Sequence, residues 1–189
     1  MNKEKIKSSL LIVPANDAEA LQILDIAEKI GLATHASYQL HGGRLDAEPD
    51  IRKIIERSNK PAIAVVELPG PETEAFIRSL GKEFVCIDHH GYDGLDRSRD
   101  EQGNFQPSSL EQFLNYFEIS DADLSALGFD PRLVRSIGIM DQGYVWELSK
   151  NGYSPDEVRT AVAYKQKFHE RLSPKEEIER VMAVARRAW

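Results

Sequence analysis

The residues best suited to chemistry are acidic and imidazole side chains that stand where apolar runs end. The runs SLLIVP (9–14), PAIAVVEL (61–68) and FVCID (84–88) are typical of buried strands, and SIGIM (136–140) is a further apolar run. In an open α/β sheet, the carboxyl ends of the strands form the edge that binds ligands. At or just after these runs the sequence places Asp17, Glu19, Glu67, Asp88, His89, His90 and Asp141. We expect them to meet at one edge of the sheet.

This combination of side chains predicts a metal centre. Carboxylate oxygens with one or two imidazoles suit Mn²⁺, Mg²⁺, Co²⁺ or Zn²⁺. Two such ions can hold a phosphoryl group, acidify a bridging water molecule and stabilise the leaving oxygen. The sequence offers neither a Walker loop nor a cysteine nucleophile for a competing mechanism. One or two Mn²⁺ ions, or Mg²⁺ or Co²⁺, are therefore the expected cofactor.

The segment VCIDHHGYDG resembles the signature of the DHH phosphoesterases, which include oligoribonucleases, exopolyphosphatases and family II pyrophosphatases. Three other segments resemble further motifs of this superfamily in the same order: IVPANDAEA, VVELPGPE and GIMDQGY. The resemblance covers residues 8–150. It implies a DHH-type α/β domain over residues 1–150, with residues 151–189 as a helical extension or linker toward an absent second domain.

The resemblance also implies roles for individual residues. His89 is expected to bind a metal ion, with Asp88 orienting its ring from behind. His90 is expected to contact the phosphate or the leaving group, so His90 and Asp88 are the expected catalytic pair. The expected metal ligands are Asp17, Glu19, Glu67, His89 and Asp141.

The chain departs from the family pattern at three positions. Glu19 and Glu67 stand where the family usually has aspartate, and Val13 stands where some members have a histidine. The extra methylene of glutamate moves the carboxylate, and metal geometry tolerates only small errors. One metal position is therefore expected to be weak or vacant.

Several of these residues have a second interpretation. Asp17 can cap a helix, Glu19 can be a solvated acid of the first helical turn, and Asp141 can cap a turn. Four further side chains have two interpretations: they contact the phosphate of the substrate, or they are solvated in loops. These side chains are His41, Arg44, Arg97 and Arg99.

Apolar runs of strand type alternate with helical patterns from Ser9 to Asp88. This alternation predicts an α/β fold: a doubly wound, mainly parallel five-stranded sheet with helices on both faces. The chain after residue 107 is expected to be a helical segment, and SPKEEIERVMAVARRAW (173–189) is expected to begin a new helix.

The composition of the chain limits the classes of ligand that we expect it to bind. The net charge of −7 argues against long nucleic acid as a ligand. No apolar run approaches the ~20 residues that span a membrane, and the single Cys86 favours the cytoplasm. We expect a metal-dependent phosphohydrolase that acts on a small phosphorylated substrate, such as a short oligonucleotide, nucleotide or polyphosphate. The alternative is a degenerate DHH domain that binds a nucleotide or a protein; the sequence does not indicate an oligomeric state.

Overall fold

The computed structural model describes residues 1–173; the helix expected from residue 173 onward lies outside this range apart from its first residue. Strands and helices alternate along the first half of the chain, and helices dominate the second half. In order the elements are α1 (Lys3–Ser8), β1 (Ser9–Pro14), α2 (Ala18–Lys29), β2 (Ala33–Ser37), the 3-10 turn η1 (Leu45–Ala47), α3 (Ile51–Arg57), β3 (Ala62–Val66), α4 (Pro71–Ser79), β4 (Glu83–Ile87), β5 (Gly91–Tyr92), β6 (Leu95–Asp96), α5 (Ser109–Tyr116), α6 (Asp121–Ala126), α7 (Pro131–Lys150) and α8 (Pro155–Leu172).

The main sheet is parallel throughout and has the strand order β2-β1-β3-β4. The α/β architecture is therefore confirmed, but the expectation of five strands is wrong for the described residues, where the sheet has four. The chain after β4 turns into a short antiparallel hairpin, β5–β6, which does not join the sheet. The later apolar run SIGIM lies inside α7, where its apolar side chains pack as one helical face.

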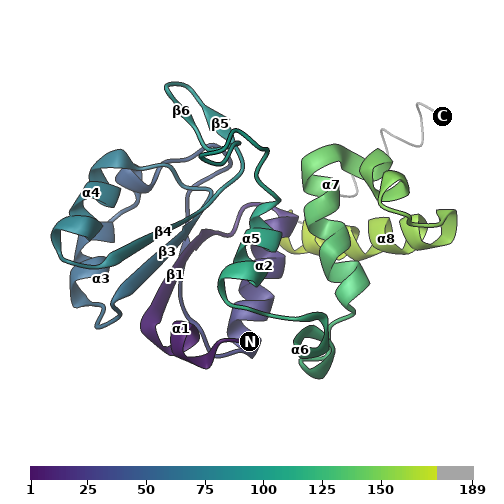
Figure 1. Ribbon diagram of the computed structural model, residues 1–189, viewed down its shortest axis with the longest axis horizontal. Helices are drawn as coiled ribbons and strands as arrows, with labels where there is room; N and C mark the ends of the chain where they lie inside the picture. The colour runs from purple at the N-terminus through teal and green to yellow at the C-terminus, as the bar shows by residue number, and fades with distance from the viewer. Residues whose placement is uncertain (174–189) are drawn as a thin grey trace.

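Helices cover both faces of the sheet (Figure 1). Leu11 and Val13 of β1 pack with the larger core, which contains side chains of α2, α5 and α7. Leu10 and Ile12 of the same strand pack against α3 and α4. This alternation follows from the strand geometry, in which successive side chains point to opposite faces. It explains why the strand is apolar at every position.

The last described helix, α8, packs against α7 and α2 on the side away from the sheet (Figure 1). Its Ala161 and Phe168 are buried in the same core as α2. The Tyr164 hydroxyl donates a hydrogen bond to Gln22 Oε1 at 2.5 Å. A domain boundary at residue 150 stays a prediction. Within residues 1–173, no helix has the length and apolar character needed to cross a membrane.

Candidate metal centre

His89 lies among three carboxylates at the carboxyl edge of the sheet. Its Nε2 is 3.1 Å from Asp141 Oδ2, 3.5 Å from Glu67 Oε1 and 3.7 Å from Glu19 Oε2. Only 10% of the His89 side chain is exposed, and Glu19 is 1% exposed. Four residues, Glu67, His89, His90 and Asp141, each offer a ligand atom within 4.8 Å of the others. This cluster could hold a metal ion.

Unpartnered polar atoms show how well the cluster fits an ion. Glu19 Oε2, Glu67 Oε1 and His89 Nε2 are buried and have no hydrogen-bond partner among the described residues. A buried polar atom without a partner carries a desolvation penalty of about 1–3 kcal/mol. Three such atoms lie around one point, and a divalent cation there would satisfy all three. The residues present therefore fit a metal ion.

Glu67 reaches the cluster from the end of β3. Its φ of 49° places it in the left-handed region, which is uncommon for residues other than glycine. Its amide still donates to Ile87 O at 3.0 Å, so the ladder with β4 continues to this residue. Residues held in such conformations cost about 1–3 kcal/mol and cluster at functional sites. The strained backbone turns Glu67 at the point where the strand delivers it to the cluster.

Glu19 is buried, so the interpretation as a solvated acid is wrong. Its Oε1 accepts a hydrogen bond from the Leu110 amide, at 2.9 Å, in the first turn of α5. One oxygen thus fixes the N-terminus of α5 while the other, Oε2, faces His89. Two elements far apart in sequence are joined at the centre by this side chain.

Gly138 allows α7 to approach that junction. A Cβ at this position would lie 2.2 Å from Ser108 Oγ and 3.1 Å from Glu19 Oε1. We expect Gly138→Ala to destabilise the metal-free protein by about 1–3 kcal/mol, the usual range for overpacking. The same change should weaken Mn²⁺ binding, because it displaces Glu19. Urea unfolding and Mn²⁺ titration check both effects; Ser125→Ala on α6 serves as the control, and equal stability of the two variants would contradict the packing argument.

Asp141 comes to the centre from a helix, in keeping with the helical segment expected after residue 107. It lies in α7, two residues before a kink at which Gly143 (φ −151°, ψ 21°) and Tyr144 (φ 57°, ψ −163°) leave helical geometry. The apolar spacing of SIGIM fits a strand and a helix equally well, and the packing of α7 on α2 and α5 decides for the helix.

Asp88 does not orient His89, which corrects its expected role. Its side chain is fully buried, and its contacts among the described residues are with His90, Tyr92 and Arg97. The His90 amide donates to Asp88 Oδ1 at 3.0 Å, and His90 Nδ1 lies 3.2 Å from the same oxygen. The Tyr92 hydroxyl donates to Oδ2 at 3.0 Å. Asp88 therefore fixes the ring of His90 and the start of the β5–β6 hairpin.

The remaining predicted residues surround the cluster or turn away from it. Asp17 caps α2, with its Oδ1 accepting from the Ala20 amide at 2.8 Å, as the second interpretation predicted. His41 is exposed, and its ring centroid lies 6.0 Å from that of His90. Arg44 is exposed. Arg97 is committed to ion pairs with Glu74 and Asp88. The Arg99 guanidinium is exposed, donates to Gly103 O and lies over Phe105.

Two side chains at the site were not predicted from the sequence. Gln112 of α5 brackets the Asp88 backbone: its Nε2 donates to Asp88 O at 2.9 Å, and its Oε1 accepts from the Asp88 amide at 3.1 Å. Tyr92, four residues after Asp88, completes the shell of that carboxylate. Its place within the DHHGYDG segment is a sequence signal, whereas Gln112 has none because only the packing of α5 on β4 brings it there.

The cluster perturbs the ionisation of its own members. Burial raises the pKa of Glu19 to about 8, and the charges of Glu67 and Asp141 add to the effect. Burial, then the charge of Glu67, raises the pKa of Asp17 to about 6. Burial alone would lower the pKa of His89, but the surrounding carboxylates outweigh it and raise the pKa to about 12. Without a metal, a proton on His89 balances the carboxylates.

Metal binding should therefore release protons. Both Glu19 and His89 have raised pKa values, and each must lose its proton before its lone pair can bind an ion. We expect Mn²⁺ binding at pH 7 to release at least about one proton, and the affinity to rise as the pH increases from 6 through 8. Calorimetric titration in buffers of different ionisation enthalpy measures this number. An affinity independent of pH over that interval would show that these groups do not bind the ion.

A hollow of about 500 Å³ opens beside the cluster. His89, His90 and Asp141 line it together with Phe105 and Gln142. Phe105 is 74% exposed, in the loop between the hairpin and α5. The hollow gives the cluster access to solvent and to a small molecule.

No protein-family model matches the sequence, and no curated protein or solved structure shows significant similarity to the chain.

Proposed function

We propose that this protein is a divalent-metal-dependent phosphohydrolase of the DHH type that acts on a small phosphorylated substrate. The observation that carries the proposal is the convergence of Glu19 Oε2, Glu67 Oε1 and His89 Nε2, buried and unpartnered, on one point beside Asp141. Three carboxylates, which are hard oxygen ligands, together with one imidazole suit Mn²⁺, with Mg²⁺ and Co²⁺ as alternatives.

We further propose that the centre holds one ion. Glu19, Glu67, His89 and Asp141 would bind it. Some members of the family that the sequence resembles have a histidine at the position of Val13, whereas Val13 is fully buried in the core and valine has no ligand atom. Asp17 already accepts the Ala20 amide as a helix cap. When bound, the ion would supply Lewis acidity, which neutralises phosphate charge and acidifies water.

The protein's own residues would position and protonate the substrate. Asp88 fixes the His90 ring through Nδ1 and, by that hydrogen bond, raises the pKa of His90. This hydrogen bond favours the protonated ring, and His90 lines the hollow beside the cluster. We propose that His90 donates this proton to the leaving oxygen. The net charge of −7 supports a small substrate, because a long polyanion would be repelled away from the ion.

The test is a panel of pyrophosphate, short polyphosphate, dinucleotides and an aryl phosphodiester, each with Mn²⁺, Mg²⁺ or EDTA. His89→Ala is the blank. We expect hydrolysis that needs the metal and is lost in the variant. Activity that survives both EDTA and His89→Ala would refute the metal mechanism. The alternative, a degenerate DHH domain that binds a nucleotide or a protein, is favoured instead if no substrate turns over but a nucleotide raises the melting temperature.

The single cysteine supports the cytoplasm as the proposed compartment.

A further inference from the structure

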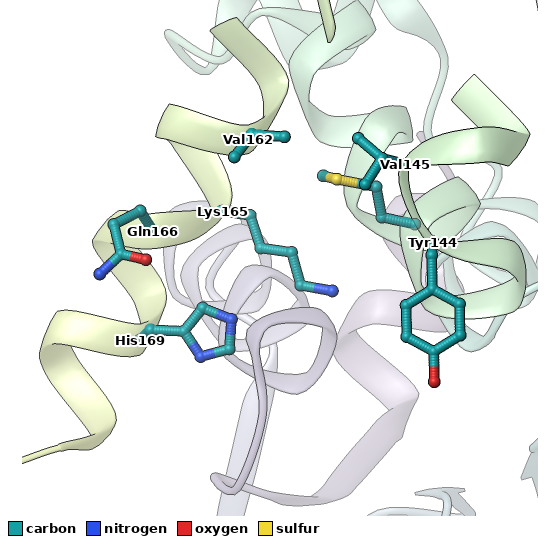
Figure 2. A pocket seen from close by; sticks show the side chains of 7 residues that line it. Tyr144, Val145, Val162, Lys165, Gln166 and His169 are labelled. Atoms are coloured by element: carbon teal, nitrogen blue, oxygen red, sulfur yellow. The ribbon is translucent and has the colours of Figure 1, made fainter. Parts of the chain in front are cut away.

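Residues around the kink of α7 line two hollows. Asp141 lines the one that contains the metal cluster, whereas its neighbour Met140 lines another, between α7 and α8. This second hollow has a volume of about 180 Å³. Its walls are mainly apolar, from Met140, Val145 and Val162. Figure 2 shows Val145 and Tyr144 on α7 facing the α8 side chains across the space. A small apolar group can fill it.

One cation extends into this hollow. Lys165 reaches from α8 into the space between the helices (Figure 2), and its side chain is half-buried. Ion pairs of the described residues occur elsewhere on α8, as in Arg132–Glu157 and Arg171–Asp25, but none involves Lys165. The charge of Lys165 acts on its neighbour His169 and on Asp141 of the metal cluster.

Exposed aromatic side chains stand at the same kink. Tyr144 is 75% exposed and Trp146 is 77% exposed. Tyr144 also has a positive φ of 57° and a ψ of −163°, a conformation that tyrosine rarely adopts. The backbone outlier turns its side chain out of the helix toward the mouth of the hollow, which Tyr144 lines. Flat apolar surfaces of this kind stack against ring systems.

We propose that the hollow between α7 and α8 is a second subsite, which holds the organic ring of a phosphate-ester substrate while Lys165 binds its phosphate. This inference rests on the proposed function and narrows its substrate class: the substrate carries an aromatic ring as well as its phosphate, as a nucleotide does, and is neither an inorganic polyphosphate nor a sugar phosphate alone. Met140, Val145 and Val162 contact the ring. Lys165 bridges the ring site and the metal cluster.

The first experiment compares ligands. AMP, ribose 5-phosphate and inorganic phosphate are titrated by calorimetry into the full chain, with Mn²⁺ and with EDTA. We expect AMP to bind at least about tenfold more tightly than ribose 5-phosphate, because burial of the ring adds apolar contact. Equal affinities for AMP and ribose 5-phosphate, or no binding of AMP, would overturn the proposal.

The second experiment compares variants. Lys165→Gln should lower the affinities for AMP and for ribose 5-phosphate alike by about tenfold, which corresponds to the loss of a charge-assisted hydrogen bond. Val162→Glu should lower the affinity for AMP to that for ribose 5-phosphate, because a carboxylate then occupies the apolar wall. Val162 is 45% exposed, so this change is not expected to disturb folding. Lys167→Gln, on the same helix but outside the hollow, is the control and should bind AMP as the unmodified protein does.

Mn²⁺ titration separates this subsite from the metal centre. Val162→Glu should bind Mn²⁺ normally, because Val162 lies in the apolar wall and not in the metal cluster. If the unmodified chain binds no Mn²⁺, the proposed function fails, and AMP binding in EDTA still decides whether the subsite exists. Unchanged AMP affinity in Lys165→Gln would overturn the subsite even with the metal centre intact. A dimer that Val162→Glu disrupts would show that this face binds a second copy of the chain, and would also overturn the proposal.

Discussion

Replacing Glu67 by glutamine is expected to lower the affinity for Mn²⁺ by at least about 100-fold, the upper end of the effect seen for residues that only support metal ligands. Glu67 Oε1 is buried without a partner and lies 3.5 Å from His89 Nε2. Glutamine keeps the length and shape of the side chain, so the loss isolates the carboxylate charge. Phosphohydrolase activity should fall with the metal affinity.

The same variant should have nearly the same stability as the unmodified protein when no metal is present, because the change relieves repulsion between carboxylates but also removes an attraction to protonated His89. The charge of Glu67 raises the pKa values of both Asp17 and Glu19, which means that these carboxylates repel one another. Removing one charge relieves this repulsion. With Mn²⁺ at 100 times its Kd, the unmodified protein gains about 2.7 kcal/mol of stability, or roughly 5–11 °C in melting temperature, and the variant gains almost none.

Thermal unfolding with EDTA and with Mn²⁺ measures both effects. Glu56→Gln, an exposed position on α3, is the matched control and should behave as the unmodified protein does in both conditions. A Glu67→Gln protein that loses stability in EDTA and keeps its response to Mn²⁺ would show that Glu67 is a structural residue and not a ligand.

Replacing Asp88 by alanine is expected to destabilise the metal-free protein by about 3–5 kcal/mol, the range for breaking a buried ion pair. The Asp88 carboxylate is fully buried and accepts hydrogen bonds from the His90 amide and the Tyr92 hydroxyl. Arg97 Nη1 lies 3.6 Å away, and that side chain is only 10% exposed. Alanine leaves these donors without their acceptor.

Asp88→Asn provides the comparison. Its carbonyl oxygen can still accept from the His90 amide, so we expect a smaller loss, about 1–2 kcal/mol. Urea unfolding in EDTA gives both values, and hydrogen exchange of residues 91–97 reports whether the hairpin loosens. If both variants unfold within about 0.5 kcal/mol of the unmodified protein, as an ordinary surface change does, the network around Asp88 does not hold this edge together.

The strands that carry the centre could be predicted from the sequence. Short apolar runs with β-branched residues fix β1 and β3, because a strand covered on both faces must be apolar at nearly every position; β4, at the edge of the sheet, is apolar in its run 84–87 but buried only at Ile87. Since these strands are parallel, their carboxyl ends meet, and the positions of Glu67 and Asp88 at one edge follow directly. The grouping of Asp17, Glu19, Glu67, His89 and Asp141 was expected on this basis; the structure brings the last four side chains together, whereas Asp17 caps α2.

Only the tertiary structure determines which neighbours each side chain at that edge contacts. Asp88 and His89 are adjacent in sequence, yet the turn after β4 sends Asp88 inward to Tyr92 and Arg97 and His89 to the carboxylates. The helical state of SIGIM depends on packing against α2 and α5, since the run by itself suits either a strand or a helix. The kink at Tyr144 and the position of Lys165 depend on how α8 packs against α7. Local patterns determine which residues reach an edge, whereas contacts between distant segments determine which atoms they face.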